Sequence, residues 1–251
     1  MAVQGLYALQ NGFIGFERNG LFFGERSGDR VQIPVACYLV KTGDATILFD
    51  TGFAPRAVPG LLRDDSLARF SDEDLLVHRL DSIGLEPHSV DVVVLSHLHF
   101  DHAGGTSLFP KSELIVQQDE YSYAHHPASC FASFYYRKNF DLPGYHWRLI
   151  EGDVELVPGV TVLRTEGHTP GHQSLLVELP ESGPIILAGD CAYWQEHIDH
   201  ERVPGVVWNP TQALHSVKRL KTIARLTGGK IFPSHDPLFW ATVTQAPDAY
   251  R

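Results

Sequence analysis

Apolar residues recur along this chain in short runs that are separated by turn residues, a pattern typical of many strands with helices between them. The segments at 31–40 (VQIPVACYLV) and 45–50 (ATILFD) predict two strands joined by a Thr-Gly-Asp turn. The short β-branched run at 91–95 (DVVVL) is typical of a buried strand. Further strands are predicted at 113–117, 153–165, 174–179, 184–188 and 230–233.

Two segments carry helix signals. The stretch SDEDLLVHRLDSIGL begins at Ser71, and Ser71 and Asp74 have the spacing of a capping box ahead of apolar residues. A second helix should start at Asn209-Pro210, an N-cap followed by proline, run to about Leu226 and stop at Thr227-Gly228-Gly229. Strands with interspersed helices predict an α/β fold in which two sheets are covered by outer helices.

Composition narrows the class of protein. The chain has 251 residues, 43% of them apolar, and no evident repeat or linker, which predicts a single domain over 1–251. Its 20 basic and 30 acidic residues give a net charge of −10, which disfavours nucleic acid as a partner. No apolar run has the length of a membrane helix and no signal peptide is evident, so we expect no membrane partner. The three cysteines lack a CxxC pair, which favours a reduced, cytoplasmic location.

The densest chemistry lies directly after the predicted strand at 91–95. The segment at 96–105, SHLHFDHAGG, places His97, His99, Asp101 and His102 within six residues. Imidazole and carboxylate groups are the ligands that zinc prefers, and such density is rarely a chance feature of a polar loop. The sequence therefore predicts a metal site on this loop.

Three further residues of the same chemical kinds follow other predicted strands. They are His168 in EGHTPGHQS, Asp190 in ILAGD and His235 in IFPSHD. Strand ends are where open α/β folds build their sites, so we expect these residues to join the first cluster. Taken singly, Asp190 is equally explained as a turn residue and His235 as a loop histidine.

The segment HxHxDH followed by separate His, Asp and His resembles the metallo-β-lactamase superfamily over nearly the whole chain. The resemblance implies an αββα sandwich and two divalent metal ions. Zinc is the expected metal, and iron and cobalt are alternatives. It implies that His97, His99 and His168 bind one ion, that Asp101, His102 and His235 bind the other, and that Asp190 and a hydroxide bridge them. It also implies that Asp50, in FDTG, supports a ligand from behind.

Within the superfamily the chain resembles the N-acyl homoserine lactonases. The resemblance rests on SHLHFDHAGG, on GHTPGHQSLLVE at 167–178, on SGPIILAGDCAYW at 182–194 and on SHD at 234–236. It implies hydrolytic opening of an acyl homoserine lactone by the bridging hydroxide, which silences quorum signalling. Tyr193 would assist at the substrate carbonyl, and Asp101 would carry a proton to the leaving oxygen. The resemblance further implies a homodimer.

Other members of the superfamily remain alternatives. A glyoxalase II-like enzyme would act on a thioester or another ester, although only sixteen residues follow His235. A persulfide dioxygenase-like oxidoreductase would use one iron. The β-lactamases often place a cysteine ligand where this chain has Asp190, and the neighbouring Cys191 should point to the opposite side, which disfavours antibiotic hydrolysis.

Aromatic residues gather in two stretches that could line a groove for an acyl chain. The first comprises 13–16 and 21–23, and the second comprises 130–140 with Tyr145 and Trp147. Core packing or a subunit interface explains any single member equally well. Phe100, inside the metal motif, is a candidate for the pocket wall. The remaining histidines, among them His172 and His197, are expected to have no special role.

Overall fold

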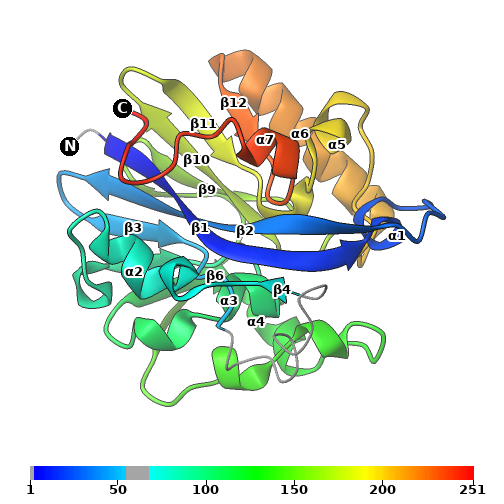
Figure 1. Ribbon diagram of the computed structural model, residues 1–251, viewed down its shortest axis with the longest axis horizontal. Coiled ribbons are helices and arrows are strands. Elements are labelled where there is room, and N and C mark those ends of the chain that lie inside the picture. Colours follow the sequence, from blue (N-terminus) through cyan, green and yellow to red (C-terminus); the bar gives the residue numbers. More distant parts are fainter. Residues whose placement is uncertain (1–2, 55–67) are drawn as a thin grey trace.

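The structure, a computed structural model, describes residues 3–54 and 68–251 and contains two β-sheets (Figure 1). The larger sheet has seven strands in the order β4-β1-β2-β3-β5-β6-β7, of which β3, β5, β6 and β7 are mutually parallel. These strands are β1 (Val3–Glu17), β2 (Arg30–Thr42), β3 (Thr46–Phe49), β4 (Ala68–Arg69), β5 (Val92–Val94), β6 (Glu113–Gln117) and β7 (His146–Ile150).

The smaller sheet has five strands in the order β12-β11-β10-β9-β8. Only its β11–β12 pair is parallel, and the other pairs are antiparallel. Its strands are β8 (Val154–Val157), β9 (Val160–Arg164), β10 (Gln173–Leu179), β11 (Gly183–Leu187) and β12 (Lys230–Phe232).

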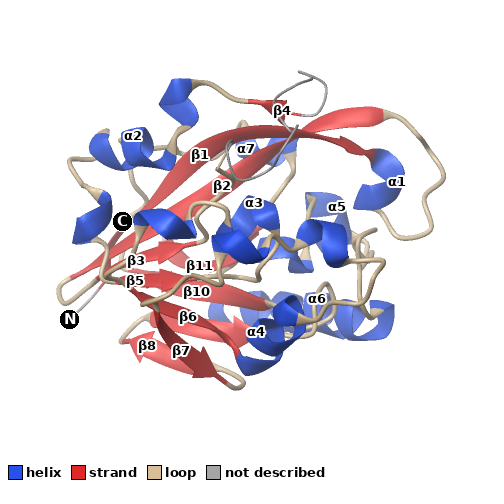
Figure 2. Cartoon of the chain, turned by 90° about the horizontal axis from the view of Figure 1, so that it is seen from below, coloured by secondary structure: helices blue, strands red, loops and turns tan. Residues whose placement is uncertain are grey.

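The main core lies between the two sheets, where Leu6, Val94 and Ile115 of the larger sheet pack against Leu175 and Ile185 of the smaller one. Because side chains alternate along a strand, neighbouring residues of the same strands point outward to the helices. The outer face of the larger sheet packs against α2 (Leu76–Asp81), α3 (Phe100–Ala103) and α4 (Gln118–His125). The smaller sheet packs against α6 (Pro210–Thr227). Helix, sheet, sheet and helix therefore form four layers, as predicted (Figures 1 and 2).

The described residues also form three short α-helices, α1 (Arg18–Leu21), α5 (Gln195–Asp199) and α7 (Pro237–Trp240), besides several 3₁₀ turns. The long strands β1 and β2 extend beyond the sandwich and carry α1 at their far end (Figure 2). None of the helices in the described part of the chain has the length and apolar character that spanning a bilayer demands.

The predicted strands at 31–40, 45–50, 91–95, 113–117, 174–179, 184–188 and 230–233 are confirmed as β2, β3, β5, β6, β10, β11 and β12. The run at 153–165 is a hairpin of two strands, with Pro158-Gly159 at its turn. The second predicted helix is also confirmed. Asn209 accepts hydrogen bonds from the N–H groups of Thr211 and Gln212 at 3.1 and 3.2 Å, and Gly228 ends the helix with a φ of 69°.

The prediction of one helix from Ser71 onward is wrong in its extent. Ser71 N–H does donate to the carboxylate of Asp74 at 2.8 Å, but that turn closes as a 3₁₀ helix over Asp72–Asp74. Leu75 then takes a ψ of 130°, which interrupts the helix before α2 begins. The interruption lets α2 bury Leu76 and Leu80 against the sheet.

Candidate metal centre

The predicted ligands meet at one edge of the sandwich because the segments that carry them all follow the carboxyl ends of strands. The loop after β5 carries His97 and His99 and leads into α3, which carries Asp101 and His102. His168 follows β9, Asp190 follows β11 and His235 follows β12. A Cβ atom on Gly105 would lie 2.4 Å from the carbonyl oxygen of Thr51, so only glycine lets α3 approach the segment after β3 this closely.

A first group of ligand atoms is formed by His97, His99, His168 and Asp190, all of them buried. The Nε2 atom of His168 lies 3.1 Å from His97 Nε2 and 3.1 Å from His99 Nδ1. A second group is formed by Asp101, His102 and His235, and the ligand atoms within each group lie within 4.8 Å of one another.

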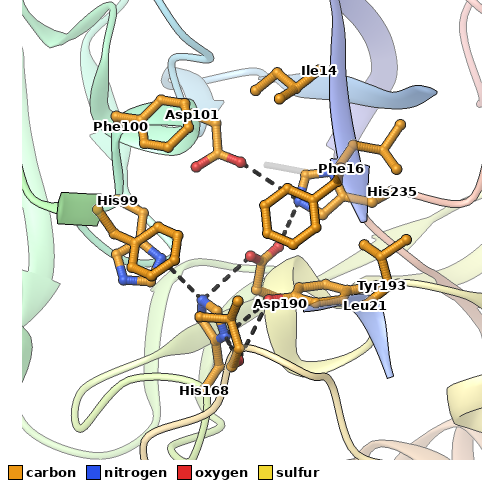
Figure 3. Close-up of a pocket in the computed structure, with 13 residues that line it drawn as sticks. Ile14, Phe16, Leu21, His99, Phe100, Asp101, His168, Asp190, Tyr193 and His235 are labelled. Atoms are coloured by element: carbon orange, nitrogen blue, oxygen red, sulfur yellow. Dashed lines mark hydrogen bonds and ion pairs between the residues drawn. The ribbon is translucent and has the colours of Figure 1, made fainter. Parts of the chain in front are cut away.

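Asp190 lies between the two groups, as Figure 3 shows for His168 on one side and His235 on the other. Its Oδ2 is 3.3 Å from His168 Nε2 and 3.7 Å from His97 Nε2. Its Oδ1 is 3.1 Å from His235 Nε2 and 3.2 Å from His102 Nε2. The structure thus brings all seven predicted ligands together, with Asp190 in the position from which a carboxylate could bridge two ions.

In three of the histidines, the ring nitrogen on the far side from the centre contacts a hydrogen-bond acceptor. His168 Nδ1 lies 2.7 Å from the carbonyl oxygen of Val206, and His235 Nδ1 lies 2.9 Å from that of Pro34. His102 Nδ1 lies 2.8 Å from the Asp50 carboxylate. Since these oxygens only accept, each Nδ1 donates a hydrogen bond, and whenever the ring is neutral its Nε2 presents a lone pair to the neighbouring residues.

Several buried lone pairs therefore face one another and the Asp190 carboxylate. Among the described atoms that face the centre, His102 Nε2 has no hydrogen-bond partner. Without a cation this arrangement is costly, because acceptors face acceptors away from water. Divalent cations between them satisfy the set, and imidazole with carboxylate is the donor chemistry that zinc and related metals prefer. The residues therefore fit two metal ions.

The two groups differ in their electrostatics. Burial, followed by the neighbouring histidines, lowers the pKa of both His97 and His99 well below the ordinary value. Burial also acts to lower the pKa of His102 and of His235, but Asp190 and Asp101 outweigh it and raise both. Burial opposes ionisation of Asp190, yet the surrounding histidines hold the pKa of its carboxyl well below its usual range.

Asp50 contacts this site from behind, as expected from the resemblance. Its carboxylate accepts hydrogen bonds from His102 Nδ1 at 2.8 Å, from Ser96 N–H at 2.6 Å and from Ser96 Oγ at 2.8 Å. Ser96 Oγ in turn lies 3.0 Å from His97 Nδ1. Asp50 has a φ of 60°, a conformation uncommon outside glycine that marks a functional constraint. Asp50 therefore orients His102 directly and His97 through Ser96.

His172 has a role that the sequence analysis missed. Its Nε2 atom accepts a hydrogen bond from the N–H of Asp190 at 2.9 Å, and its Nδ1 atom lies 2.8 Å from Thr165 Oγ1. Burial lowers the pKa of His172 to about 3, so the ring stays neutral and remains an acceptor. The GHTPGH spacing placed His172 near the site, but only the fold shows that it holds the Asp190 turn.

Tyr193 lines a pocket that opens over the site and that, with the solvent at its mouth, has a volume of about 390 Å³. Its hydroxyl is 3.3 Å from His168 Nδ1 and 3.5 Å from the Val206 carbonyl oxygen. Burial, with Asp190 and Asp101, raises the pKa of Tyr193 well above its ordinary value, so the phenol keeps its proton and remains a donor.

The pocket walls are largely apolar (Figure 3). The described residues that form these walls around the ligands are Ile14, Phe16, Leu21, Ile33, Phe100, Phe134 and Val206. Members of both predicted aromatic stretches therefore line the pocket, and so does Phe100. Tyr145 and Trp147 instead pack on the outer face of the larger sheet. Cys191 points away from the site into the core beneath α6, as predicted.

The fold and this centre match a known class. Residues 30–235 match the metallo-beta-lactamase superfamily. An N-acyl homoserine lactonase from a Bacillus species is 39% identical, with 94% of each chain covered, and the lactonase AiiA of Bacillus thuringiensis subsp. kurstaki is 38% identical with the same coverage. A solved N-acyl homoserine lactone hydrolase, with the product N-hexanoyl-L-homoserine at its catalytic metal centre, is 35% identical, with all of both chains covered and a TM-score of 0.89. The chain therefore belongs to the metallo-β-lactamase superfamily and, within it, to the N-acyl homoserine lactonases.

Proposed function

We propose that this protein is a dinuclear metal hydrolase that opens the lactone ring of N-acyl homoserine lactones. The observation that carries the proposal is the position of Asp190 between two ligand groups at the base of an apolar pocket. Metal ions bound to the two ligand groups would suit an ester carbonyl, and the apolar walls of the pocket suit an acyl chain. The relatives named as lactonases, and the product bound to one of them, support the same substrate for this chain.

Two divalent ions, zinc in our proposal, would be held by residues of the two groups. His97, His99 and His168 would hold one, Asp101, His102 and His235 the other, and Asp190 would contact both. When bound, such ions lower the pKa of a shared water and polarise a carbonyl oxygen. The protein's part is to fix the ligands, through Asp50, His172 and the carbonyls of Val206 and Pro34.

Tyr193 would act on the substrate carbonyl. Its phenol is protonated and its existing contacts are long, so it can turn to donate a hydrogen bond to the oxygen on which negative charge develops. A donor aimed at that oxygen stabilises the tetrahedral transition state more than the ground state. Tyr193 is buried, and its partner would therefore be a substrate group inside the pocket rather than bulk water.

Asp101 would carry the proton. Its Oδ2 atom faces His102 and His235 at 3.7 and 3.8 Å, which leaves its second oxygen for proton transfer. The attacking water adds its oxygen to the carbonyl carbon, the ring carbon–oxygen bond breaks, and the water's proton reaches the departing alkoxide through Asp101. The products are one carboxylate and one hydroxyl, which together form the ring-opened N-acyl homoserine, and the second proton of the water is released to solvent.

The test is mass spectrometry of short- and long-chain N-acyl homoserine lactones after exposure to the zinc- or cobalt-loaded protein. We expect the addition of one water, reversed at acid pH as the ring closes again, and much slower hydration with Tyr193→Phe and with Asp101→Asn. If fully metallated wild-type protein hydrates no acyl length, the lactonase proposal is wrong, and thioesters become the next substrates to test.

Three finer points also belong to this proposal. We propose zinc as the native metal, a homodimer and a cytoplasmic location. Metal analysis of protein purified without added metal should find two ions per chain, whereas a single iron would favour the oxidoreductase alternative. Light scattering at several concentrations would detect the dimer, and fractionation of the source cells would locate the protein.

A further inference from the structure

Helix α4 supplies none of the predicted ligands, yet it places a buried carboxylate beneath them. Glu120 is fully buried. Its Oε1 atom accepts hydrogen bonds from the N–H of Leu98 at 3.0 Å and from the hydroxyl of Tyr135 at 3.3 Å. Its Oε2 atom accepts one from the N–H of Gly171 at 3.3 Å. A carboxylate in such a position needs a reason, because burying an acidic group is costly.

Leu98, Tyr135 and Gly171 all belong to the surroundings of the first ligand group. Leu98 lies between His97 and His99 in the chain. Gly171 lies in the short loop that begins at His168 and returns to β10. Tyr135 packs edge-on against the ring of His99, with ring centroids 4.7 Å apart. One side chain therefore ties together the two loops that carry His97, His99 and His168.

The packing around Glu120 leaves these loops little freedom. A Cβ atom on Gly171 would lie 2.2 Å from the backbone nitrogen of Glu120, so the loop after His168 passes directly against α4. The second ligand group has a different support, because Asp50 holds His102. Each group thus has a buried carboxylate in direct contact with its support, Glu120 for the first group and Asp50 for the second.

We propose that Glu120 is the positioning residue of the first metal site, setting the separation of His97 and His99 from His168. The inference rests on the metal centre of the proposed function but not on its substrate. Glu120 belongs to neither ligand group and does not line the pocket. It acts through the backbone of the two loops, and its loss should therefore weaken the first metal and leave the second nearly unchanged.

The chemistry of the side chain explains why a carboxylate is needed. Both oxygens of Glu120 accept backbone hydrogen bonds, whereas glutamine has one acceptor and one NH₂ donor. Glu120→Gln must therefore point an N–H at another N–H or give up one of the two loops. Aspartate is shorter by one methylene and cannot reach both loops. Burial raises the pKa of Glu120, and the hydrogen bonds it accepts oppose that shift.

The experiment measures metal affinity rather than activity. Metal-free wild type and Glu120→Gln are titrated with Co²⁺ in competition with a chelator, and the absorption bands of the two sites are followed. His168→Ala and His235→Ala assign the bands to the first and second sites. We expect Glu120→Gln to weaken the first site about 10- to 100-fold, the range typical of outer-shell partners, with the second site within about 3-fold of wild type.

Two further variants separate positioning from general stability. Ala124→Gly lies in the same helix and is also buried, so it should lower the Tm without changing either affinity. Tyr135→Phe removes only the hydroxyl contact and should weaken the first site less than Glu120→Gln does. Unchanged affinities in Glu120→Gln, or equal losses at both sites, would overturn the inference. The readout involves no lactone, so it stands or falls separately from the lactonase proposal.

Discussion

The two ligand groups of the metal centre differ in what shifts the pKa values of their histidines. The first, around His97, His99 and His168, is a set of neutral imidazoles whose pKa values are lowered by burial. The second, around Asp101, His102 and His235, pairs imidazoles with carboxylates that raise the histidine pKa values. Asp190 contacts both. One site therefore depends on packing that excludes water, and the other depends on charge balance.

The largest effect should come from the residue that the two groups share. Asp190→Asn removes the negative charge between them while keeping the side chain's size. We expect a loss of affinity at both sites that exceeds the ~10- to 100-fold typical of outer-shell partners, together with loss of hydrolysis. Metal analysis after dialysis measures this. Retention of two ions by the variant would show that Asp190 is not a bridging ligand.

Asp50→Asn should weaken metal binding at the two groups unequally. Asparagine tolerates a positive φ, so the backbone at Asp50 should survive, but the amide cannot accept from His102 and Ser96 as the carboxylate does. We expect the second metal to bind about 10-fold to 100-fold more weakly, with a smaller effect on the first through Ser96 and His97. The cobalt titration described above would detect it, and an equal loss at both sites would contradict it.

Acidification should also act on the groups unequally. His102 and His235 have raised pKa values in the metal-free protein, so a falling pH protonates them first and protons compete with the metal. His97 and His99 have lowered pKa values and stay unprotonated over the same range. Between about pH 8 and about pH 6, the second site should lose more affinity than the first. Chelator competition at both pH values measures the difference, and parallel losses would refute it.

The smallest effect is expected from a substitution in the pocket wall rather than at a ligand. The ring of Phe134 lies over His99 with centroids 5.1 Å apart and forms part of the pocket wall. Phe134→Ala removes apolar contact that an acyl chain would share, so KM should rise by roughly 3- to 10-fold while kcat changes little. Kinetics with a matched series of acyl lengths test this, and Phe23→Ala, which is 55% exposed and outside the pocket, is the control.

The sequence patterns missed β1, β4 and β7, and β1 shows why. β1 spans Val3–Glu17 and pairs along most of β2, yet it contains Gln10, Asn11 and Gly12, which read locally as a turn. The pairing shifts register between Gln10 and Phe13, so the strand accommodates them as an irregularity. Asn11 is buried there and accepts a hydrogen bond from the N–H of Phe53 at 2.7 Å. A partner that is distant in sequence satisfies a residue whose local preference is for a loop.

The sequence by itself determined most of the core strands, the helix at 210–227 and four of the seven candidate ligands, because apolar periodicity and a dense HxHxDH loop are local signals. Strand-end positions and the resemblance added His168, Asp190 and His235 as candidates. Tertiary structure alone decided the supports that Glu120 and His172 provide, whereas the support from Asp50 follows from the resemblance. Glu120 and His172 are polar residues like many others until the chain folds, and they act on loops that are 22 and 18 residues away along the chain. The physical reason is that a hydrogen bond between distant segments becomes strong only after the core has buried both partners, and no local pattern encodes that burial.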